Sequence, residues 1–217
     1  MTDHILVTGM VIFTAPVNDY DRRIILLTKE RGKITVFAKG ARRQGSRMLA
    51  ATNPFCFGTF KLYEGKTAYN LIEANITNYF EELRSDFGGA YLGMYFLEFA
   101  DYYARENNDE IELLKLLYQT VRAIIKDSID NRLVKIIYEM KIMVVNGEFP
   151  GIPQDRNVSK AASYTIDFIV KTPVEKLYTF KVTDEVLEEL ITISDMYRNK
   201  YIDKHFKSLD LIGEFGV

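Results

Sequence analysis

The chain has 217 residues, 47% hydrophobic and 27% charged, which are the proportions of a globular protein large enough to bury one or two cores. A single cysteine excludes a disulfide framework and a four-thiolate zinc site within one chain, and no apolar run reaches the length of a membrane span. The N-terminus has no basic segment before a long apolar stretch, so we expect a protein of the reducing cytoplasm.

The formal net charge of −2 conceals an uneven distribution of charge along the chain. Residues 1–80 contain 11 Lys and Arg against 6 Asp and Glu, whereas residues 81–217 contain 17 against 24. A basic first part and an acidic second part indicate separate roles. We expect the first part to contact a polyanion and the second part to contact proteins.

The first 80 residues show strand signals at intervals of about ten residues. The expected strands are 5–14, 24–28, 33–39, 55–63 and 67–76, with a short helical turn at 48–51. Gly9 and Gly58 indicate a bulge or a sharp bend within a strand. Five short strands with a break between the third and the fourth are typical of an OB-type β-barrel.

After about residue 80 the apolar residues recur at helical spacing. The expected helices are 86–105, 109–125, 130–144 and 184–197, and the third is apolar on most sides, as in the centre of a bundle. Alternation over 164–170, followed by 177–182, predicts a small β-hairpin. We therefore predict an α+β protein of two domains, an OB-fold domain at 1–80 and a mostly helical domain at 81–217.

The most basic stretch runs from Arg22 to Arg47 and contains nine Lys or Arg residues against one acid, Glu30. In its second strand, Ile34, Val36 and Ala38 alternate with more polar positions. Alternate residues of a strand share a face, so one face would be apolar and the other would place Phe37 between two lysines.

Two interpretations of this basic stretch are open. A half-buried hairpin normally exposes its charges to water, whereas cations beside an aromatic residue suit a phosphate backbone and its bases. The segment Gly40–Arg47 favours nucleic acid, because it adds three arginines and has no apolar residue larger than Ala41. We predict DNA contact by Arg22, Arg23, Lys33, Lys39, Arg42, Arg43 and Arg47. Phe37 is either a base-stacking platform or a residue that packs on the helical domain.

Residues suited to catalysis are scarce. His4 and His205 lie at opposite ends of the chain, and there is no glycine-rich phosphate loop. Asp19 and Asp21 are the best candidates for a metal-binding carboxylate pair, but aspartates of this kind more often stabilise a turn. Cys56 lies between two phenylalanines, as expected of a buried apolar side chain. We therefore predict a binding protein, not an enzyme, with no cofactor and no metal.

Several segments resemble the RecO family of bacterial recombination mediators, and together they span nearly the whole chain. The most specific is Phe37–Arg43, FAKGARR. The others are Gly9–Phe13, Asp21–Arg23, Thr28–Lys33, Phe57–Gly58, Leu62–Tyr63, Asn146–Pro150 and Tyr201–Leu209.

The resemblance implies an OB fold followed by a helical domain, without enzymatic activity. It also implies binding of single- and double-stranded DNA and annealing of complementary strands. The implied partners are RecR, the C-terminal tail of single-stranded DNA-binding protein (SSB) and, indirectly, the RecA recombinase, in the cytoplasm at the nucleoid. Candidate cations for the acidic SSB tail are Lys115, Arg122, Arg132 and Lys135.

One segment departs from the family pattern. Many family members carry a four-cysteine zinc site after the central helix, but the matching residues here, Gly151–Thr179, contain no cysteine. The resemblance therefore implies a variant without zinc. Two other functions stay open from the residues alone: an RNA- or ribosome-associated OB-fold protein with a helical interaction domain, and a metal-dependent nuclease that uses Asp19 and Asp21.

Overall fold

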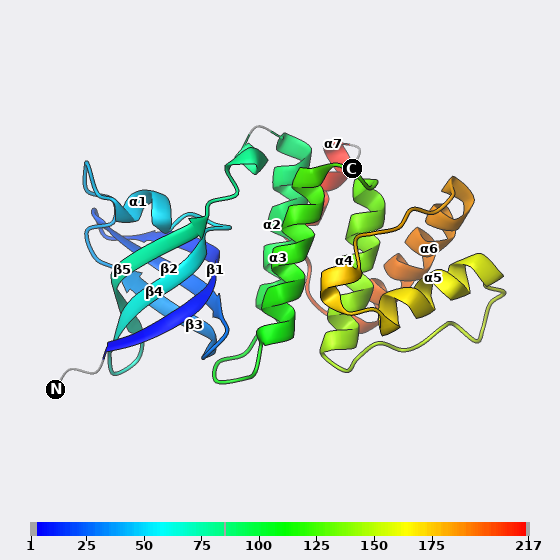
Figure 1. Ribbon diagram of the computed structural model, residues 1–217, viewed down its shortest axis with the longest axis horizontal. Coiled ribbons are helices and arrows are strands. Elements are labelled where there is room, and N and C mark those ends of the chain that lie inside the picture. The colour runs from blue at the N-terminus through cyan, green and yellow to red at the C-terminus, as the bar shows by residue number, and fades with distance from the viewer. Residues whose placement is uncertain (1–3, 85, 216–217) are drawn as a thin grey trace. The chain divides into compact units, whose positions relative to one another are not determined.

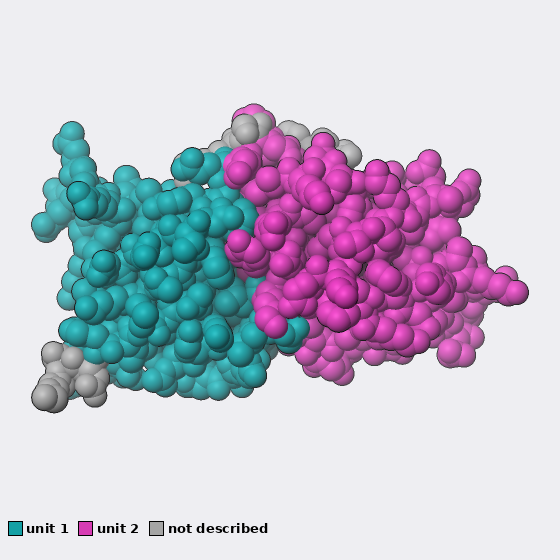
Figure 2. All heavy atoms as spheres, viewed as in Figure 1, with its two compact units in different colours: residues 1–81, 100–114 teal, residues 82–99, 115–217 magenta. Residues whose placement is uncertain are grey.

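The computed structural model describes residues 4–84 and 86–215, which form two compact units. Unit 1 contains the chain up to Glu81 together with Ala100–Leu114, and unit 2 contains Glu82–Phe99 and the chain from Lys115 onward (Figure 2).

Unit 1 contains a closed five-stranded β-barrel (Figure 1). Its strands, in the order in which they neighbour one another, are β1 (His4–Val17), β2 (Asp21–Thr28), β3 (Gly32–Ala38), β5 (Tyr69–Asn78) and β4 (Phe57–Glu64). The short helix α1 (Met48–Ala51) follows β3, and β3 and β5 pair in parallel. The predicted OB-type barrel is confirmed, including the break between the third and fourth strands.

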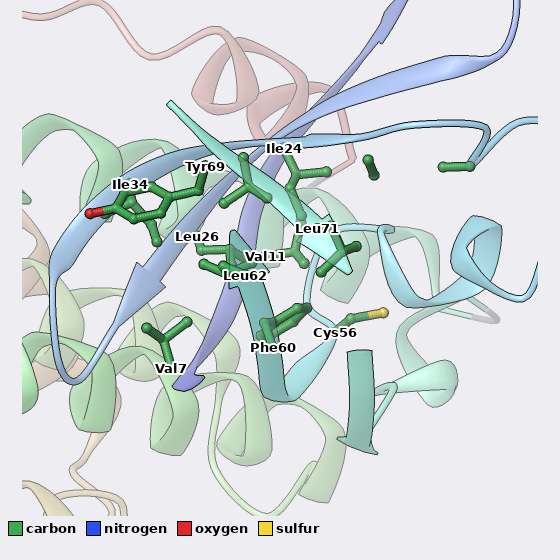
Figure 3. Packing of buried hydrophobic residues seen from close by; sticks show 13 residues of the cluster. Val7, Val11, Ile24, Leu26, Ile34, Cys56, Phe60, Leu62, Tyr69 and Leu71 are labelled. Atoms are coloured by element: carbon green, nitrogen blue, oxygen red, sulfur yellow. The ribbon is translucent and has the colours of Figure 1, made fainter. Parts of the chain in front are cut away.

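The barrel closes around an apolar interior that every strand supplies. Strand β3 alternates strictly between buried and half-buried residues, as its sequence predicted. Figure 3 shows the buried side chains of this apolar interior packed against one another, with Phe60 among the largest. Cys56 is fully buried in this cluster, in agreement with the sequence prediction.

Glycines allow close approach between strands β1, β2, β4 and β5. A Cβ on Gly9 would lie 2.3 Å from the carbonyl oxygen of Leu27, and one on Gly58 would lie 2.2 Å from that of Asn75. The pairing register of β4 with β5 shifts next to Gly58. These positions therefore accept only glycine without a movement of the backbone.

Residues 100–114 belong to the same unit as the barrel because they pair with the start of β3. Gly32 forms a β-bridge with Glu106, and the Lys33 amide donates a hydrogen bond to the Arg105 carbonyl oxygen at 2.9 Å. The amide of Asn107 donates to the carbonyl of Arg31 at 3.0 Å. The division into domains at 1–80 and 81–217 stays a prediction. In the structure, residues 100–114, which fall in the second predicted range, belong to the unit of the barrel.

The rest of the described chain is helical, as predicted. The α-helices are α2 (Phe87–Tyr103), α3 (Ile111–Lys126), α4 (Asn131–Val145), α5 (Lys160–Lys171), α6 (Asp184–Tyr201) and α7 (Lys207–Phe215), and two 3₁₀ helices occupy Glu81–Arg84 and Val174–Lys176. Helix α4 is buried along most of its length, which confirms its predicted central place. Its N-cap is Asp130, whose carboxylate accepts from the Arg132 amide at 2.8 Å.

The predicted β-hairpin around residues 164–182 is wrong, because residues 160–171 form helix α5. Ser159 caps this helix by accepting a hydrogen bond from the Ala162 amide at 3.1 Å. The buried residues Ala162, Ile166 and Ile169 follow helical spacing, whereas Tyr164 is 73% exposed. The apparent alternation around Tyr164 therefore arose from a helical stripe with polar residues between its members.

A buried lysine closes the C-terminal end of α5. The ammonium of Lys141, on α4, donates to the carbonyl oxygens of Ile169, Val170 and Thr172 at 3.1, 2.9 and 2.8 Å. The last carbonyls of a helix have no partners within the helix, and a cation there also opposes the helix dipole. Lys141 thus connects α4 to the C-terminal end of α5.

Candidate nucleic-acid interface

The loop after β3 and the turn between β1 and β2 lie side by side at one end of the barrel. The Arg42 amide donates to the Tyr20 carbonyl at 2.9 Å, and the Arg42 guanidinium donates to the Asn18 carbonyl at 3.2 Å. From the other direction, the Asp21 carboxylate accepts from the Gly40 amide at 2.7 Å. These bonds fix the arginine-bearing loop against the turn.

Five of the predicted DNA contacts are exposed cations, and we call this set the basic ridge. Within the described part of the chain, none of the five forms an ion pair with a carboxylate. Their charges therefore remain available to an anionic ligand. The basic ridge consists of Arg23, Lys39, Arg42, Arg43 and Arg47.

Arg22, in contrast, is occupied within the protein. Its guanidinium donates to the Leu49 carbonyl at 3.0 Å, to the Thr52 hydroxyl at 3.0 Å and to the Asn53 side-chain oxygen at 2.9 Å. Burial, followed by the nearby charge of Arg42, lowers the pKa of Arg22 from its usual value. Arg22 therefore holds the α1 segment on the barrel.

Lys33 lies at the far end of β3 from the loop that carries Lys39. The two lysines are six positions apart along the strand, a distance of about 20 Å. The Lys33 ammonium donates to the backbone carbonyl of Asp101 at 2.7 Å and pairs with its carboxylate at 3.1 Å. The structure thus does not bring Lys33 together with the basic ridge.

Phe37 is half-buried on the outer face of β3, directly opposite Arg23 on β2. Phe13 of β1 is 40% exposed, and the Arg23 guanidinium lies over its ring at 5.6 Å from the centroid. In the same way, the Arg43 guanidinium lies over the ring of Tyr20 at 5.5 Å. Phe13 and Tyr20 were not among the predicted contacts, although a tyrosine in a polar turn is a signal that points to the exposed ring of Tyr20.

A groove follows the outer face of β2 and β3 toward the turn between β4 and β5, with a volume of about 450 Å³. Lys33, Lys66 and Arg105 line it together with Glu64 and Glu106, so its charge is mixed. In OB folds the β2–β3 face and the two loops that flank it contact oligonucleotides. Here the positive charge is concentrated at the β1–β2 end of that surface.

The carboxylate pair considered for a nuclease has a different role in the structure. One oxygen of Asp21 is used by the Gly40 amide, and Asp19 is an exposed residue of the β1–β2 turn. Among residues 4–84 and 86–215, no group of three or more His, Cys, Asp or Glu residues is placed to hold a metal ion. Over the same ranges, no helix is both long and apolar enough to cross a membrane.

Three of the four candidate cations for an acidic tail are paired with carboxylates in unit 2. Lys115 lies 3.6 Å from Glu175, and Lys135 lies 3.0 Å from the buried Glu139. Arg132 contacts Asp130 and Glu188, and its hydrogen bonds lower the pKa of the Asp130 carboxyl. Arg122 on α3 is exposed and has no partner among the described residues.

The fold defines the class of this protein: a closed five-stranded OB-type barrel with an exposed cationic end, followed by a helical region. Residues 1–80 match the family model "Recombination protein O N terminal", and residues 84–154 and 151–210 match "Recombination protein O C terminal". The chain belongs to the RecO family of DNA repair proteins.

Several curated relatives match along nearly their whole length. The chain is 25% identical to "DNA repair protein RecO" of Clostridium novyi over 94% of this chain and 91% of the relative. The protein of the same name from Clostridium acetobutylicum is 27% identical, over 94% and 95% of the two chains. That from Acetivibrio thermocellus is 23% identical, over 97% and 96%.

Proposed function

We propose that this RecO-family protein is a recombination mediator of the bacterial cytoplasm that binds single- and double-stranded DNA and anneals complementary strands. We propose further that, with RecR, it helps load RecA onto DNA coated by SSB. The observation that carries the proposal is the basic ridge, five exposed cations at one end of an OB-type barrel that have no carboxylate partner among residues 4–84 and 86–215.

Annealing places two polyanions side by side, so their mutual repulsion must be screened while their bases stay free to pair. Cations that contact phosphates do this, because each neutralised phosphate releases counterions. The five cations of the basic ridge are proposed to contact the DNA backbone. Arg22 and Lys33 are proposed to act indirectly, by positioning the α1 segment and residues 100–114.

The helical region is proposed to contact proteins, including the acidic C-terminal tail of SSB. An exposed cation without a carboxylate partner is the simplest attachment point for such a tail, since an existing ion pair would have to break first. Among the four candidates Arg122 meets this condition in the described chain. Its proposed role is tested by titrating an SSB-tail peptide against Arg122→Glu.

The test of the DNA-binding proposal is annealing of complementary oligonucleotides, with and without SSB, over a series of salt concentrations. Arg43→Glu is the informative variant, because the Arg42 side chain also holds the β1–β2 turn. Lys160→Glu makes the same change of charge at an exposed position on α5 and serves as the control.

We expect Arg43→Glu to slow annealing and to weaken binding to all DNA sequences alike, while Lys160→Glu behaves as wild type. The slope of log affinity against log salt on single strands should become shallower by about 0.7 for each phosphate that the variant no longer neutralises. A reduction confined to particular sequences would contradict backbone contact. Annealing absent in the wild type, with RNA of the same sequence displacing DNA, would favour the RNA-associated alternative.

A further inference from the structure

Two exposed aromatic rings on the barrel are each covered by an arginine of the basic ridge. Tyr20, at the end of the β1–β2 turn, is 55% exposed and carries the Arg43 guanidinium over its ring. Phe13, on β1, is 40% exposed and carries the Arg23 guanidinium. Both separations, 5.5 and 5.6 Å from the ring centroids, lie within the range of cation–π attraction.

The backbone around each ring is fixed although the ring is exposed. The Tyr20 carbonyl accepts from the Arg42 amide at 2.9 Å, and the guanidinium of the same arginine bonds the Asn18 carbonyl. The register of β1 against β2 shifts between Val11 and Phe13. Such a bulge redirects side chains, and here Val11 and Ile12 are both buried while Phe13 faces outward. Neither ring contributes to the apolar core of the barrel.

We propose that Tyr20 and Phe13 are base-stacking sites for single-stranded DNA, each covered by an arginine in the free protein. When a strand binds, the guanidinium moves from the ring to a neighbouring phosphate, and an unpaired base takes its place on the ring. This inference rests on the proposed DNA-binding function and adds to it the residues that recognise unpaired bases. A base is a flat π-surface, so stacking of this kind tolerates any sequence.

The arrangement distinguishes single strands from duplex. Bases within a duplex are already stacked on their neighbours and cannot reach a ring at the surface of the barrel, whereas the phosphates of both forms can reach the arginines. The rings therefore add affinity for single strands alone. Pairing of two strands withdraws their bases from the rings, which weakens the hold on the annealed product.

The first test measures the affinity of Tyr20→Ala for a single strand, for a duplex of equal length and for an abasic strand that has phosphates but no bases. We expect single-strand affinity to fall about fivefold or more, while affinities for the duplex and the abasic strand stay at the wild-type value. Tyr20→Phe, which keeps the ring, should keep the single-strand affinity. Tyr164→Ala removes an exposed tyrosine of α5 and is the control.

The second test uses the absence of tryptophan from the sequence. Tyr20→Trp and Phe13→Trp each introduce a sole tryptophan, whose fluorescence is quenched when a base stacks on the indole. We expect quenching by the single strand but not by the abasic strand, and no quenching in Tyr164→Trp. Arg43→Ala should weaken binding to all three ligands, because it removes a phosphate contact.

The outcomes separate this inference from the function beneath it. If the wild type binds single strands but Tyr20→Ala changes nothing, or weakens all three ligands equally, the stacking role is wrong and the DNA-binding proposal stands. The same holds if the abasic strand quenches the introduced tryptophan as strongly as the intact strand does. A wild type that binds none of the three ligands would overturn both.

Discussion

Arg22 and Arg23 are neighbours in the sequence and have opposite surroundings in the structure. Successive residues of a strand point to opposite faces, so Arg23 projects from the outer face of β2 beside Phe37. Arg22 projects the other way and donates three hydrogen bonds to the α1 segment. One basic dipeptide therefore supplies a surface charge and an internal connection.

The pair Arg22→Ala and Arg23→Ala separates these two roles. We expect Arg22→Ala to lower the free energy of unfolding by about 2 kcal/mol, because it leaves partly buried acceptors without their charged donor. Arg23→Ala should change stability by about 0.5 kcal/mol or less and should weaken binding of single strands. Urea unfolding and oligonucleotide titration of both variants measure this. Unchanged stability in Arg22→Ala would contradict its positioning role.

The junction between β3 and residues 100–114 depends on one glycine. Gly32 has a φ of +64°, and a Cβ there would lie 2.2 Å from the Arg105 carbonyl oxygen. Gly45, in the loop of the basic ridge, has a similar φ of +77° but no atom within 4 Å of such a Cβ. The two positions thus share the backbone requirement and differ in their surroundings.

Gly32→Ala and Gly45→Ala therefore isolate the effect of close approach. The positive φ should cost each variant about 1 kcal/mol of stability. Gly32→Ala should lose clearly more, since the added methyl displaces residues 105–108 from the edge of β3. Thermal unfolding of the two variants in parallel gives the comparison, and equal losses would show that this close approach contributes little.

Helices α2, α4 and α6 meet at a buried carboxylate. Glu139 of α4 accepts from the Tyr95 hydroxyl at 2.5 Å, the Ser194 hydroxyl at 2.6 Å and the Arg198 guanidinium at 3.0 Å. Burial acts to raise the pKa of Glu139, but Lys135 and Arg198, with the two hydroxyl donors, bring it below its usual value of 4.5. The charged form is therefore the stable form in the folded protein.

This lowered pKa predicts how stability depends on pH. A carboxyl group whose pKa is lower in the folded state adds stability above pH 4.5, its unfolded value, and that stability is lost as the pH falls through the folded pKa. Glu139→Gln should cost about 3 kcal/mol at pH 7. As the pH falls below 4.5, the free energy of unfolding measured in urea should decrease less steeply for the variant than for the wild type. If the stability of the variant and that of the wild type fell equally with pH, the lowered pKa of Glu139 would not contribute to stability.

Over the whole molecule, positive charge gathers on the barrel and negative charge on the helical region, although the net charge is only −2. Because exposed charges separated by more than about 10 Å are largely screened at physiological salt, a bound strand responds to local charge and not to the net value. A slightly acidic protein can therefore bind a polyanion through one basic surface.

Amide hydrogen exchange with and without a single-stranded oligonucleotide tests this division of roles. We expect slower exchange in residues 18–23 and 39–47 and no change in helices α4 to α6. A peptide with the SSB-tail sequence should instead slow exchange around Arg122 on α3 and leave residues 18–23 and 39–47 unchanged. Protection of α4 to α6 by the oligonucleotide would contradict the assignment of DNA binding to the barrel.

Local sequence patterns were sufficient for the five strands, most of the helices, the buried cysteine and the concentration of cations between residues 22 and 47. These features depend on periodicity and composition over short windows, which a strand or helix imposes directly on its own residues. Over the seven residues 164–170, however, periods of 2 and 3.6 fit almost equally well. The choice of a helix there required the Ser159 cap and the burial of Ile166 and Ile169.

Short stretches of sequence do not show which cations are exposed and which are bonded to other parts of the protein. The partners of Arg22 lie 27 to 31 positions away in the sequence, and that of Lys33 lies 68 away. Likewise, Tyr20 gains its arginine only when the loop after β3 meets the β1–β2 turn, and the Arg23 guanidinium reaches Phe13 through the pairing register of β1 with β2. Composition specified that a basic surface would exist, and long-range packing selected the side chains that form it.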